Sequence, residues 1–286
     1  MDNVSESVKP SWSRIKVAPL NGISKLSSCR SIKPLKIMNP RNLSDCCQVY
    51  LSNYGGGFVA GDEIYLSVEC MPHSKTYIGS QAETKIYKSF DKKTSGQTIV
   101  GRLHPHSLTV VCPDALIPYK GSRFFQRHLW HMDSNAVLIL ADWFHAGRSA
   151  LGEDFQFNRF SSEIQIIVNG KKEILDRLKI EQKRDALLFA GPFAAYKSCL
   201  NLYLIGDLHP GLIRAIQAKV DELFQQNSKD IAGGHLWMAL NRVSSMSCVF
   251  RALSAEKQDI TALLDELFKA LEHEEILGFN PLARRH

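Results

Sequence analysis

The chain has 286 residues, of which 44% are hydrophobic and 22% charged, and its formal net charge is +6. This composition is ordinary for a globular protein, and the length allows a sizeable core. No apolar run approaches the roughly 18 residues that a membrane-spanning helix needs. The longest candidate, Ala136 to Phe144, is interrupted by Asp142. We therefore expect no membrane span.

The positive charge is concentrated at the start of the sequence. Residues 1–41 hold eight Lys or Arg against Asp2 and Glu6, which gives this segment the whole net charge of +6. A basic segment can bind nucleic acid or an acidic protein. Because the basic residues are scattered singly and no aromatic residues alternate with them, a solvated surface is the favoured interpretation.

The cysteines and the first residues indicate the compartment. Seven cysteines, an odd number, show no C-x-x-C spacing, which is typical of reduced thiols rather than a disulfide framework. The first fourteen residues lack an apolar signal core. We expect a cytoplasmic protein that is not secreted.

Strand and turn patterns fill the chain from Arg14 to about Leu178. Short β-rich runs alternate with Gly, Pro, Ser and Asn clusters, and Asn169-Gly170 is typical of a hairpin turn. Spacings of about 8–12 residues favour a sandwich or a layered, β-helix-like stack over βαβ units. The predicted strands are Ser13–Val17, Cys47–Leu51, Glu63–Cys70, Thr76–Ile78, Thr84–Tyr87, Thr98–Leu103, Ser107–Val111, Phe124–Trp130, Ala136–Ala141, Phe155–Phe160, Glu163–Val168, Glu173–Leu178, His235–Leu240 and Ser245–Leu253.

Helical periodicity occurs only in the last third. Apolar stripes predict two helices, near 210–226 and 255–273, each with one face toward the core. We detect no internal repeat and no linker. The sequence thus predicts one mainly β domain over 1–286, with two helices in its C-terminal half and the basic segment 1–41 partly integrated.

A glycine-rich bend separates two of the early strands. Four glycines, Gly55, Gly56, Gly57 and Gly61, lie within seven residues and are followed by Asp62. Gly55, Gly57 and Ala60 match the dinucleotide fingerprint G-x-G-x-x-A, but that site requires a helix after the glycines, whereas Glu63–Cys70 reads as a strand. A phosphate-binding P-loop also fails, because Asp62 stands where it needs Lys. The bend joins strand to strand and does not bind a nucleotide.

Known catalytic and metal-binding patterns are missing. The sequence has no G-x-S-x-G elbow, no H-E-x-x-H and no metal-type Cys/His spacing. His104 and His106 are the most metal-like pair, because residues i and i+2 of an extended segment share a face. Two surface histidines beside a turn are the favoured alternative. We expect no catalytic residues.

One acidic residue stands out by its context. Asp142 ends an apolar run, and Arg148 follows six residues later. A buried carboxylate needs a partner, so this spacing suggests that Asp142 pairs with Arg148. A structural ion pair and a functional acid are both open at this point.

Four blocks of the sequence resemble the UreD/UreH family of urease accessory proteins. The first is Gly56-Gly57-Phe58-Val59-Ala60-Gly61-Asp62, and the second is Gln81-Ala82-Glu83-Thr84-Lys85-Ile86-Tyr87-Lys88-Ser89. The third is Pro113-Asp114, Pro118 and Gln126-Arg127, although Ala115-Leu116-Ile117 departs from the usual spacer. The fourth, from Asp142 to Glu153 and on to Glu163, is similar to eukaryotic members. The matches run from about Pro34 to Arg251.

The resemblance implies a scaffold rather than an enzyme. Members of this family dock on the urease apoprotein and bind UreF, through which the nickel-carrying GTPase UreG is recruited. An internal passage is thought to conduct Ni²⁺ to the urease active site. The resemblance implies no tightly bound cofactor, and it implies that Ni²⁺ binds transiently. The residues that the resemblance proposes for the route or the partner surface are Asp142, Glu153, Arg148, Glu83 and Glu163. Two other classes stay open: a nucleic-acid-binding β protein, and a hydrolase in which Asp142, Glu153 and a histidine would share a pocket.

Overall fold

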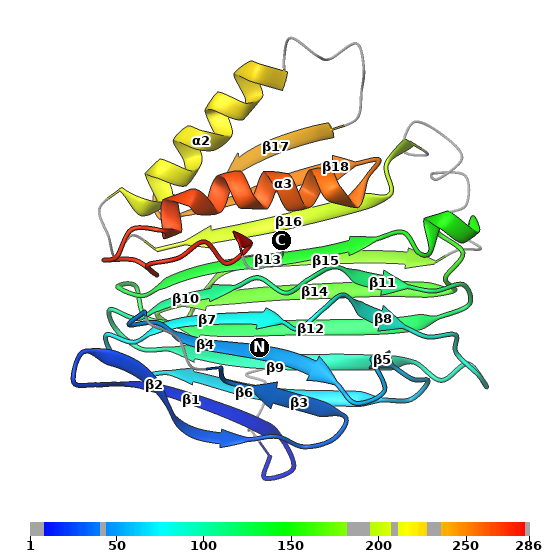
Figure 1. The fold of residues 1–286 in the computed structure, drawn as a ribbon, viewed down its shortest axis with the longest axis horizontal. Coiled ribbons are helices and arrows are strands. Elements are labelled where there is room, and N and C mark those ends of the chain that lie inside the picture. The colour runs from blue at the N-terminus through cyan, green and yellow to red at the C-terminus, as the bar shows by residue number, and fades with distance from the viewer. Residues whose placement is uncertain (1–8, 41–43, 182–194, 207–210, 228–235, 284–286) are drawn as a thin grey trace.

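The computed structural model describes residues 9–40, 44–181, 195–206, 211–227 and 236–283. Most of its strands form two large sheets that stack face to face (Figure 1). The first sheet has the order β15–β14–β12–β9–β6–β1–β2. Its strands are β1 (Ser13–Leu20), β2 (Ile23–Arg30), β6 (Glu63–Cys70), β9 (Ser95–Leu103), β12 (Arg123–Met132), β14 (Arg159–Val168) and β15 (Lys171–Glu181).

The second sheet has the order β17–β18–β16–β13–β10–β7–β4–β3, with three short strands attached to it. Its main strands are β3 (Leu35–Met38), β4 (Cys47–Asn53), β7 (Lys75–Ser80), β10 (Leu108–Val111), β13 (Val137–His145), β16 (Ser198–Ile205), β17 (Leu236–Arg242) and β18 (Ser247–Ser254). The short strands are β5 (Gly57–Phe58), β8 (Thr84–Ile86) and β11 (Leu116–Pro118).

The centre of the chain winds as a β-solenoid. Strands β6, β7 and β8 form one coil, β9, β10 and β11 the next, and β12 and β13 begin a third. Each strand pairs in parallel with its counterpart one coil away, for example Leu66 with Ile99 and Ile99 with His128. The layered, mainly β prediction is confirmed, whereas the expectation of no repeat is wrong at the structural level. The repeat shows in the sequence only as two short turns, Pro72-His73-Ser74 and Pro105-His106-Ser107.

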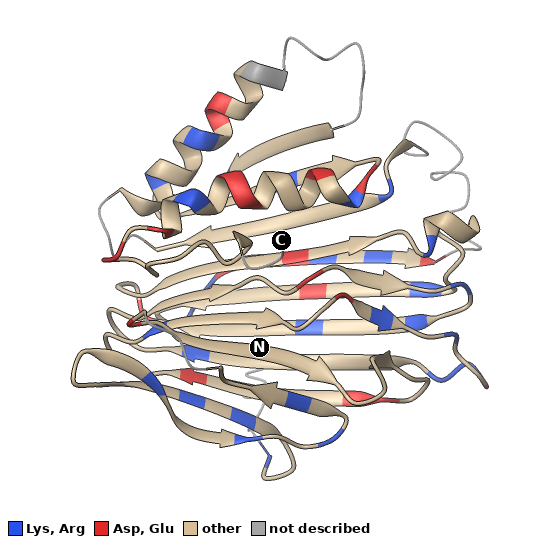
Figure 2. Cartoon of the chain, in the orientation of Figure 1, with Lys and Arg blue, Asp and Glu red and all other residues tan. Residues whose placement is uncertain are grey.

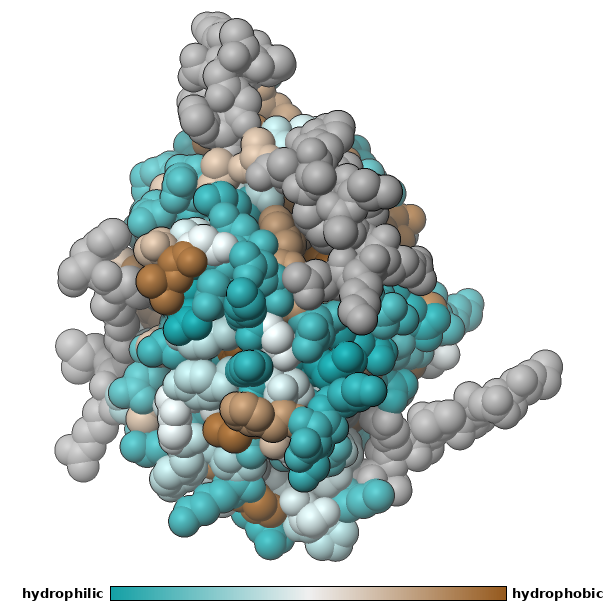
Figure 3. Space-filling model, turned by 90° about the vertical axis from the view of Figure 1, so that its right-hand side faces the viewer, coloured by the Kyte–Doolittle hydropathy of each residue, from teal (hydrophilic) through white to brown (hydrophobic). Residues whose placement is uncertain are grey.

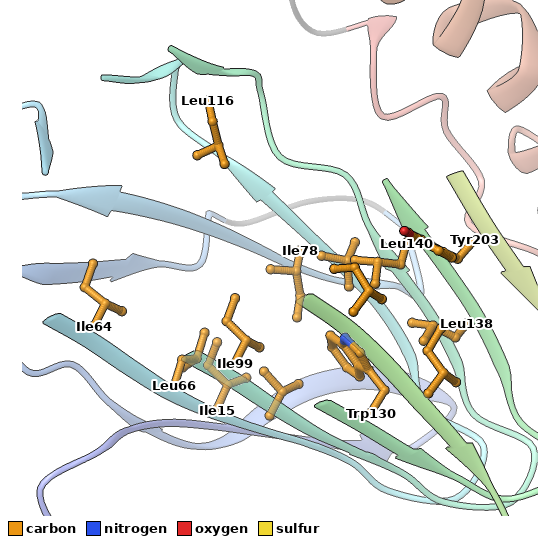
Figure 4. Packing of buried hydrophobic residues seen from close by; sticks show 14 of the residues in the cluster. Ile15, Ile64, Leu66, Ile78, Ile99, Leu116, Trp130, Leu138, Leu140 and Tyr203 are labelled. Atoms are coloured by element: carbon orange, nitrogen blue, oxygen red, sulfur yellow. The ribbon is translucent and has the colours of Figure 1, made fainter. Parts of the chain in front are cut away.

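Two apolar layers hold the fold together. The first lies between the sheets and includes Ile15, Leu66, Trp130 and Leu138 (Figure 4). The second lies between the outer face of the second sheet and the helices, so that β13 is buried along its whole length. A strand that is covered on both faces has a continuous apolar sequence. Val137 to Ala141 is such a run. Full burial of one such large side chain contributes about 1.5–3 kcal/mol.

The helices lie where the sequence predicts them. Helix α2 spans Leu212–Asn227 and α3 spans Lys257–Phe268, with the 3₁₀ turn η3 (Lys269–Leu271) after it. A further 3₁₀ turn, η1 (Ser149–Leu151), follows β13. No helix in the described part of the chain is long and apolar enough to span a membrane.

Some elements differ from the prediction. Strands β2, β3 and β16 and the short strands β5 and β11 were not predicted. Phe155–Phe160 was predicted as a strand, but β14 begins only at Arg159, and Phe155 has the positive φ of a turn residue. His235 lies outside the described residues. The described part of the basic segment is paired into both sheets, through β1 and β2 in the first and β3 in the second.

A buried polar layer as the candidate functional site

Asp142 lies in the middle of β13 and points between the two sheets. Alternation along β13 places Leu138, Leu140, Asp142 and Phe144 on this inner side. Asp142 is only 8% exposed. Its Oδ1 accepts a hydrogen bond from Gln126 Nε2 at 2.5 Å, and its Oδ2 accepts one from Ser162 Oγ at 2.7 Å. Both donors come from the opposite sheet, so Asp142 links the two sheets.

A chain of donors orients the partner of Asp142. Gln97 Nε2 donates to Gln126 Oε1 at 2.8 Å, which fixes the Gln126 amide with its nitrogen toward Asp142. The same nitrogen donates to Ser162 Oγ at 2.9 Å. These three donors lie on neighbouring strands of the first sheet, because Gln97 pairs with Gln126 and Gln126 with Ser162. The sheet register therefore builds the site.

The polar side chains continue on the second sheet beyond Asp142. Asp142 is in register with Asn201, and Asn201 with Arg251. Arg251 donates to Asn201 Oδ1 and to Asp176 Oδ2, each at 2.5 Å, and Tyr203 Oη also donates to Asp176 at 2.9 Å. The side chains of Arg251 and Asp176 are 36% and 21% exposed. The polar layer, defined as Gln97, Gln126, Ser162, Asp142, Asn201, Arg251, Asp176 and Tyr203, thus extends from the interior to a partly exposed edge.

Burial controls the charge of Asp142. Desolvation raises the pKa of its carboxyl from 3.8 to about 6, although the hydrogen bonds from Ser162 and Gln126 favour the ionised form. At neutral pH most molecules therefore carry a buried negative charge that no ion pair within the described residues neutralises directly. Such a group attracts a cation.

A cavity of about 50 Å³ adjoins Asp142 between the sheets. Gln97, Gln126 and Asp142 line it, together with Asn53 and His128. The Nδ2 atom of Asn53 and the Nδ1 atom of His128 are buried there without a hydrogen-bond partner. A cavity needs only about 10–15 Å³ to hold a water molecule, and water fills polar cavities. The cavity therefore has the size and the lining for a few ordered waters. Burial lowers the pKa of His128 to about 4, so its imidazole is neutral and can act as a ligand.

Arg148 does not contact Asp142, and the predicted pair is wrong. Arg148 instead forms a two-pronged pair with Glu153, with its Nε at 2.8 Å and its Nη2 at 2.5 Å from the carboxylate oxygens. Its guanidinium also lies 4.3 Å from the centre of the Tyr119 ring. The six-residue spacing of Asp142 and Arg148 does not bring them together, because β13 points Asp142 inward, whereas Arg148 lies in the loop after the strand. Glu153 does not line the cavity, which removes the arrangement that the hydrolase alternative required.

The two weaker acidic candidates lie away from Asp142. Glu163 is on the outer side of β14, where Arg127 and Arg177 hold it at 3.1 and 2.7 Å. Glu83, in the loop before β8, forms an ion pair with Lys257 of α3. Neither lines the cavity beside Asp142.

The glycine bend joins β4, β5 and β6 as strands, and no helix follows it. Gly56 and Gly61 have φ values of +74° and +88°, which side chains rarely adopt. A Cβ on Gly57 would lie 2.2 Å from the carbonyl oxygen of Lys85. Asp62 Oδ2 accepts a hydrogen bond from the Val59 N–H at 2.8 Å and closes the turn. The bend serves close packing between coils.

Three of the four resembling blocks form neighbouring loops at one end of the molecule. Tyr87 N–H donates to the Phe58 carbonyl, Ser89 N–H to Gly121, and Lys120 N–H to Glu153. The exposed fractions of Val59, Phe90 and Leu151 there are 50%, 65% and 66%. Figure 3 shows this end as a largely hydrophilic face with small separate apolar patches.

The predicted histidine pair does not converge. His104 Nε2 lies 3.1 Å from Glu69 Oε1, and Lys16 binds the other oxygen of the same carboxylate. The His106 ring instead stacks on His73. Within the described residues no group of three or more His, Cys, Asp or Glu could hold a metal ion.

Sequence reasoning missed most of the polar layer. The available signal was the alternation Phe124, Gln126, His128, Trp130 on β12, which puts two polar side chains on an apolar face. Asn201, Asp176 and Arg251 come from β16, β15 and β18, so only the register reveals that they belong together.

The architecture and the site define a β-solenoid with a buried polar layer and an adjoining polar cavity. Comparison with known proteins assigns its family. The family model described as UreD urease accessory protein matches residues 12–286. Over 95% of the chain it is 32% identical to a urease accessory protein UreD of Cytophaga hutchinsonii, covering 97% of that protein. It is 28% identical to a urease accessory protein D of Arabidopsis thaliana over 74% of both chains. A rice protein of the same name is 30% identical over 59% of this chain and 56% of its own length. The chain belongs to the UreD family of urease accessory proteins.

Proposed function

We propose that this protein is a non-enzymatic scaffold of urease maturation in the cytoplasm. It binds the urease apoprotein and UreF, joins UreG through UreF, and helps to pass Ni²⁺ to the urease active site. Membership of the family supports the general role. None of the seven cysteines, all of which lie in the described residues, forms a disulfide, in keeping with a reducing compartment.

The observation that carries the nickel role is Asp142 in its polar surroundings. Burying a carboxylate between two packed sheets costs folding free energy unless partners replace its lost hydration. Here the carboxylate keeps two neutral donors, faces a cavity with unsatisfied polar atoms, and continues into a polar layer that reaches the edge. Carboxylate, imidazole and amide groups with water bind a divalent ion weakly enough to release it. The polar layer is therefore a suitable hydrated route for Ni²⁺ as cargo.

The end that carries the glycine bend is the partner-facing surface in this proposal. Glu153 and Arg148 anchor its outer loops, while Val59, Phe90 and Leu151 offer apolar contacts. Exposed apolar side chains rimmed by polar ones are typical of protein interfaces. Glu83 and Glu163 contribute through their ion pairs rather than along the route.

Nucleic-acid binding is the weaker candidate. Lys and Arg are spread over strands, loops and helices instead of forming one stripe (Figure 2). Lys16 of the basic segment is already paired with Glu69. A salt-dependent gel shift with duplex and single-stranded DNA would reveal this activity.

The proposed role is tested by co-expressing urease and its other accessory proteins with and without this chain. Nickel per urease subunit is measured by atomic absorption, and complex formation with UreF by co-purification. Urease that reaches the same nickel content at limiting Ni²⁺ without the chain would refute the role in maturation.

A further inference from the structure

Two histidines stack on each other at the end of the solenoid opposite the glycine bend. His73 lies in the turn between β6 and β7, and His106 in the turn between β9 and β10 (Figure 1). Their ring centres are 4.9 Å apart, and the ring planes differ by 14°. Both side chains are exposed, and neither forms a hydrogen bond or ion pair within the described part of the chain.

The backbone holds the two rings in register. His73 and His106 occupy the same position in successive coils and have nearly equal φ values of 61° and 60°. The His73 N–H donates to the Pro105 carbonyl at 3.2 Å, which ties one turn to the next. The serine after each histidine closes its turn in the same way, because Ser74 Oγ donates to Met71 and Ser107 Oγ to His104, each at 2.7 Å. Two imidazoles are thus presented side by side by a repeated, hydrogen-bonded frame.

We propose that His73 and His106 form a surface site for a divalent transition-metal ion such as Ni²⁺. Imidazole nitrogen is a preferred ligand for these metals. An ion bonded to two imidazole nitrogens at about 2.1 Å sets those nitrogens about 3–4 Å apart. Rings whose centres are 4.9 Å apart are close enough for side-chain rotation to turn one nitrogen of each toward a shared ion. Water completes the coordination, so that the site exchanges its ion readily.

The site is separate from the polar layer and does not depend on the proposed maturation role. His104, although two residues from His106, is not part of it, because Glu69 holds its ring on another side. A pair that binds one ion gains because the second ligand acts at a high effective concentration. Removing either imidazole should therefore weaken binding at least about tenfold.

The test uses purified full-length protein and NiCl₂ alone. Asn tolerates the left-handed backbone, so His73→Asn and His106→Asn remove a ring while keeping each turn. His104→Ala is the matched control. Isothermal titration calorimetry gives the affinity, and paramagnetic broadening of the histidine ring signals in NMR locates the ion.

We expect Ni²⁺ to broaden the signals of His73 and His106 together at the lowest nickel concentrations. Each Asn variant should weaken this binding at least about tenfold, the double variant should bind at least as weakly as the weaker single variant, and His104→Ala should bind as the wild type. Broadening confined to other residues, or unchanged binding in the double variant, would overturn the proposal.

Discussion

Gln126 on one sheet donates a hydrogen bond from its side-chain Nε2 to Oδ1 of Asp142 on the other sheet, at 2.5 Å. The contact lies between two largely apolar strand faces. The contact joins β12 to β13 through a charge rather than through packing. Because Gln97 holds the other end of the Gln126 amide, that nitrogen faces Asp142 in the folded protein. The predictions for the polar layer follow from this contact.

Gln126→Leu should destabilise the protein by about 1–3 kcal/mol, because it removes one of the two donors to the buried carboxylate of Asp142 and leaves the amide of Gln97 without its acceptor. The loss should be larger at pH 7.5 than at pH 5, since Asp142 is mostly neutral at the lower pH. Urea unfolding followed by circular dichroism measures both values. Phe125→Leu, on the outer side of the same strand, is the control and should change stability little. Equal losses in the two variants would contradict this account.

Asp142→Asn should change how stability depends on pH. The carboxyl titrates at 3.8 in its ordinary state and at about 6 in the folded protein. Folding therefore favours the neutral form of the carboxyl. The stability that this preference gives the folded protein is fully present below pH 3.8 and is lost as the pH rises through about 6. A shift of this size corresponds to about 3 kcal/mol. The stability of Asp142→Asn relative to wild type should rise by about this amount between pH 4 and pH 7. Parallel curves for the two proteins would show that Asp142 ionises freely.

Gly57→Ala should impair folding, because its Cβ would lie 2.2 Å from the Lys85 carbonyl oxygen, which is backbone. We expect a loss of at least about 1–3 kcal/mol, as for other overpacked sites. Thermal denaturation and the soluble yield measure it. Gly152→Asn is the control, because Gly152 has open space around it and Asn tolerates its positive φ. A stable Gly57→Ala variant that only loses partner binding would make the bend a contact site.

The sequence predicted the mainly β layering, the two helices and the glycine bend as a strand connection, because alternation, apolar stripes and glycine clusters are local signals. It did not reveal β2, whose residues are mostly exposed and only weakly alternating, or the structural repeat, since only the Pro-His-Ser turns share residues between coils. These features depend on pairing between distant segments.

The candidate site was predicted only in part. Asp142 stood out because a charge interrupts an apolar run, but its partners could not be inferred from neighbours in the sequence. Arg148 is close to Asp142 in sequence but points away from it. Gln126 and Ser162 are 16 and 20 residues away in sequence, and both donate hydrogen bonds to Asp142. Strand register decides such contacts, and register is not visible in one sequence.

The central claim is that the carboxylate of Asp142 helps to pass Ni²⁺, and Asp142→Asn tests it most directly, because the variant removes the charge and relieves the burial cost at neutral pH. The measurement is the nickel content of urease co-expressed with this variant at limiting Ni²⁺, with Ser161→Ala, on the outer side of β14, as control. A contact of about 1.4 kcal/mol corresponds to a tenfold change in affinity. We predict a lower nickel content, reduced by up to about this factor, with wild-type stability or better and unchanged co-purification with UreF. Full nickel loading by the Asp142→Asn variant would contradict the claim.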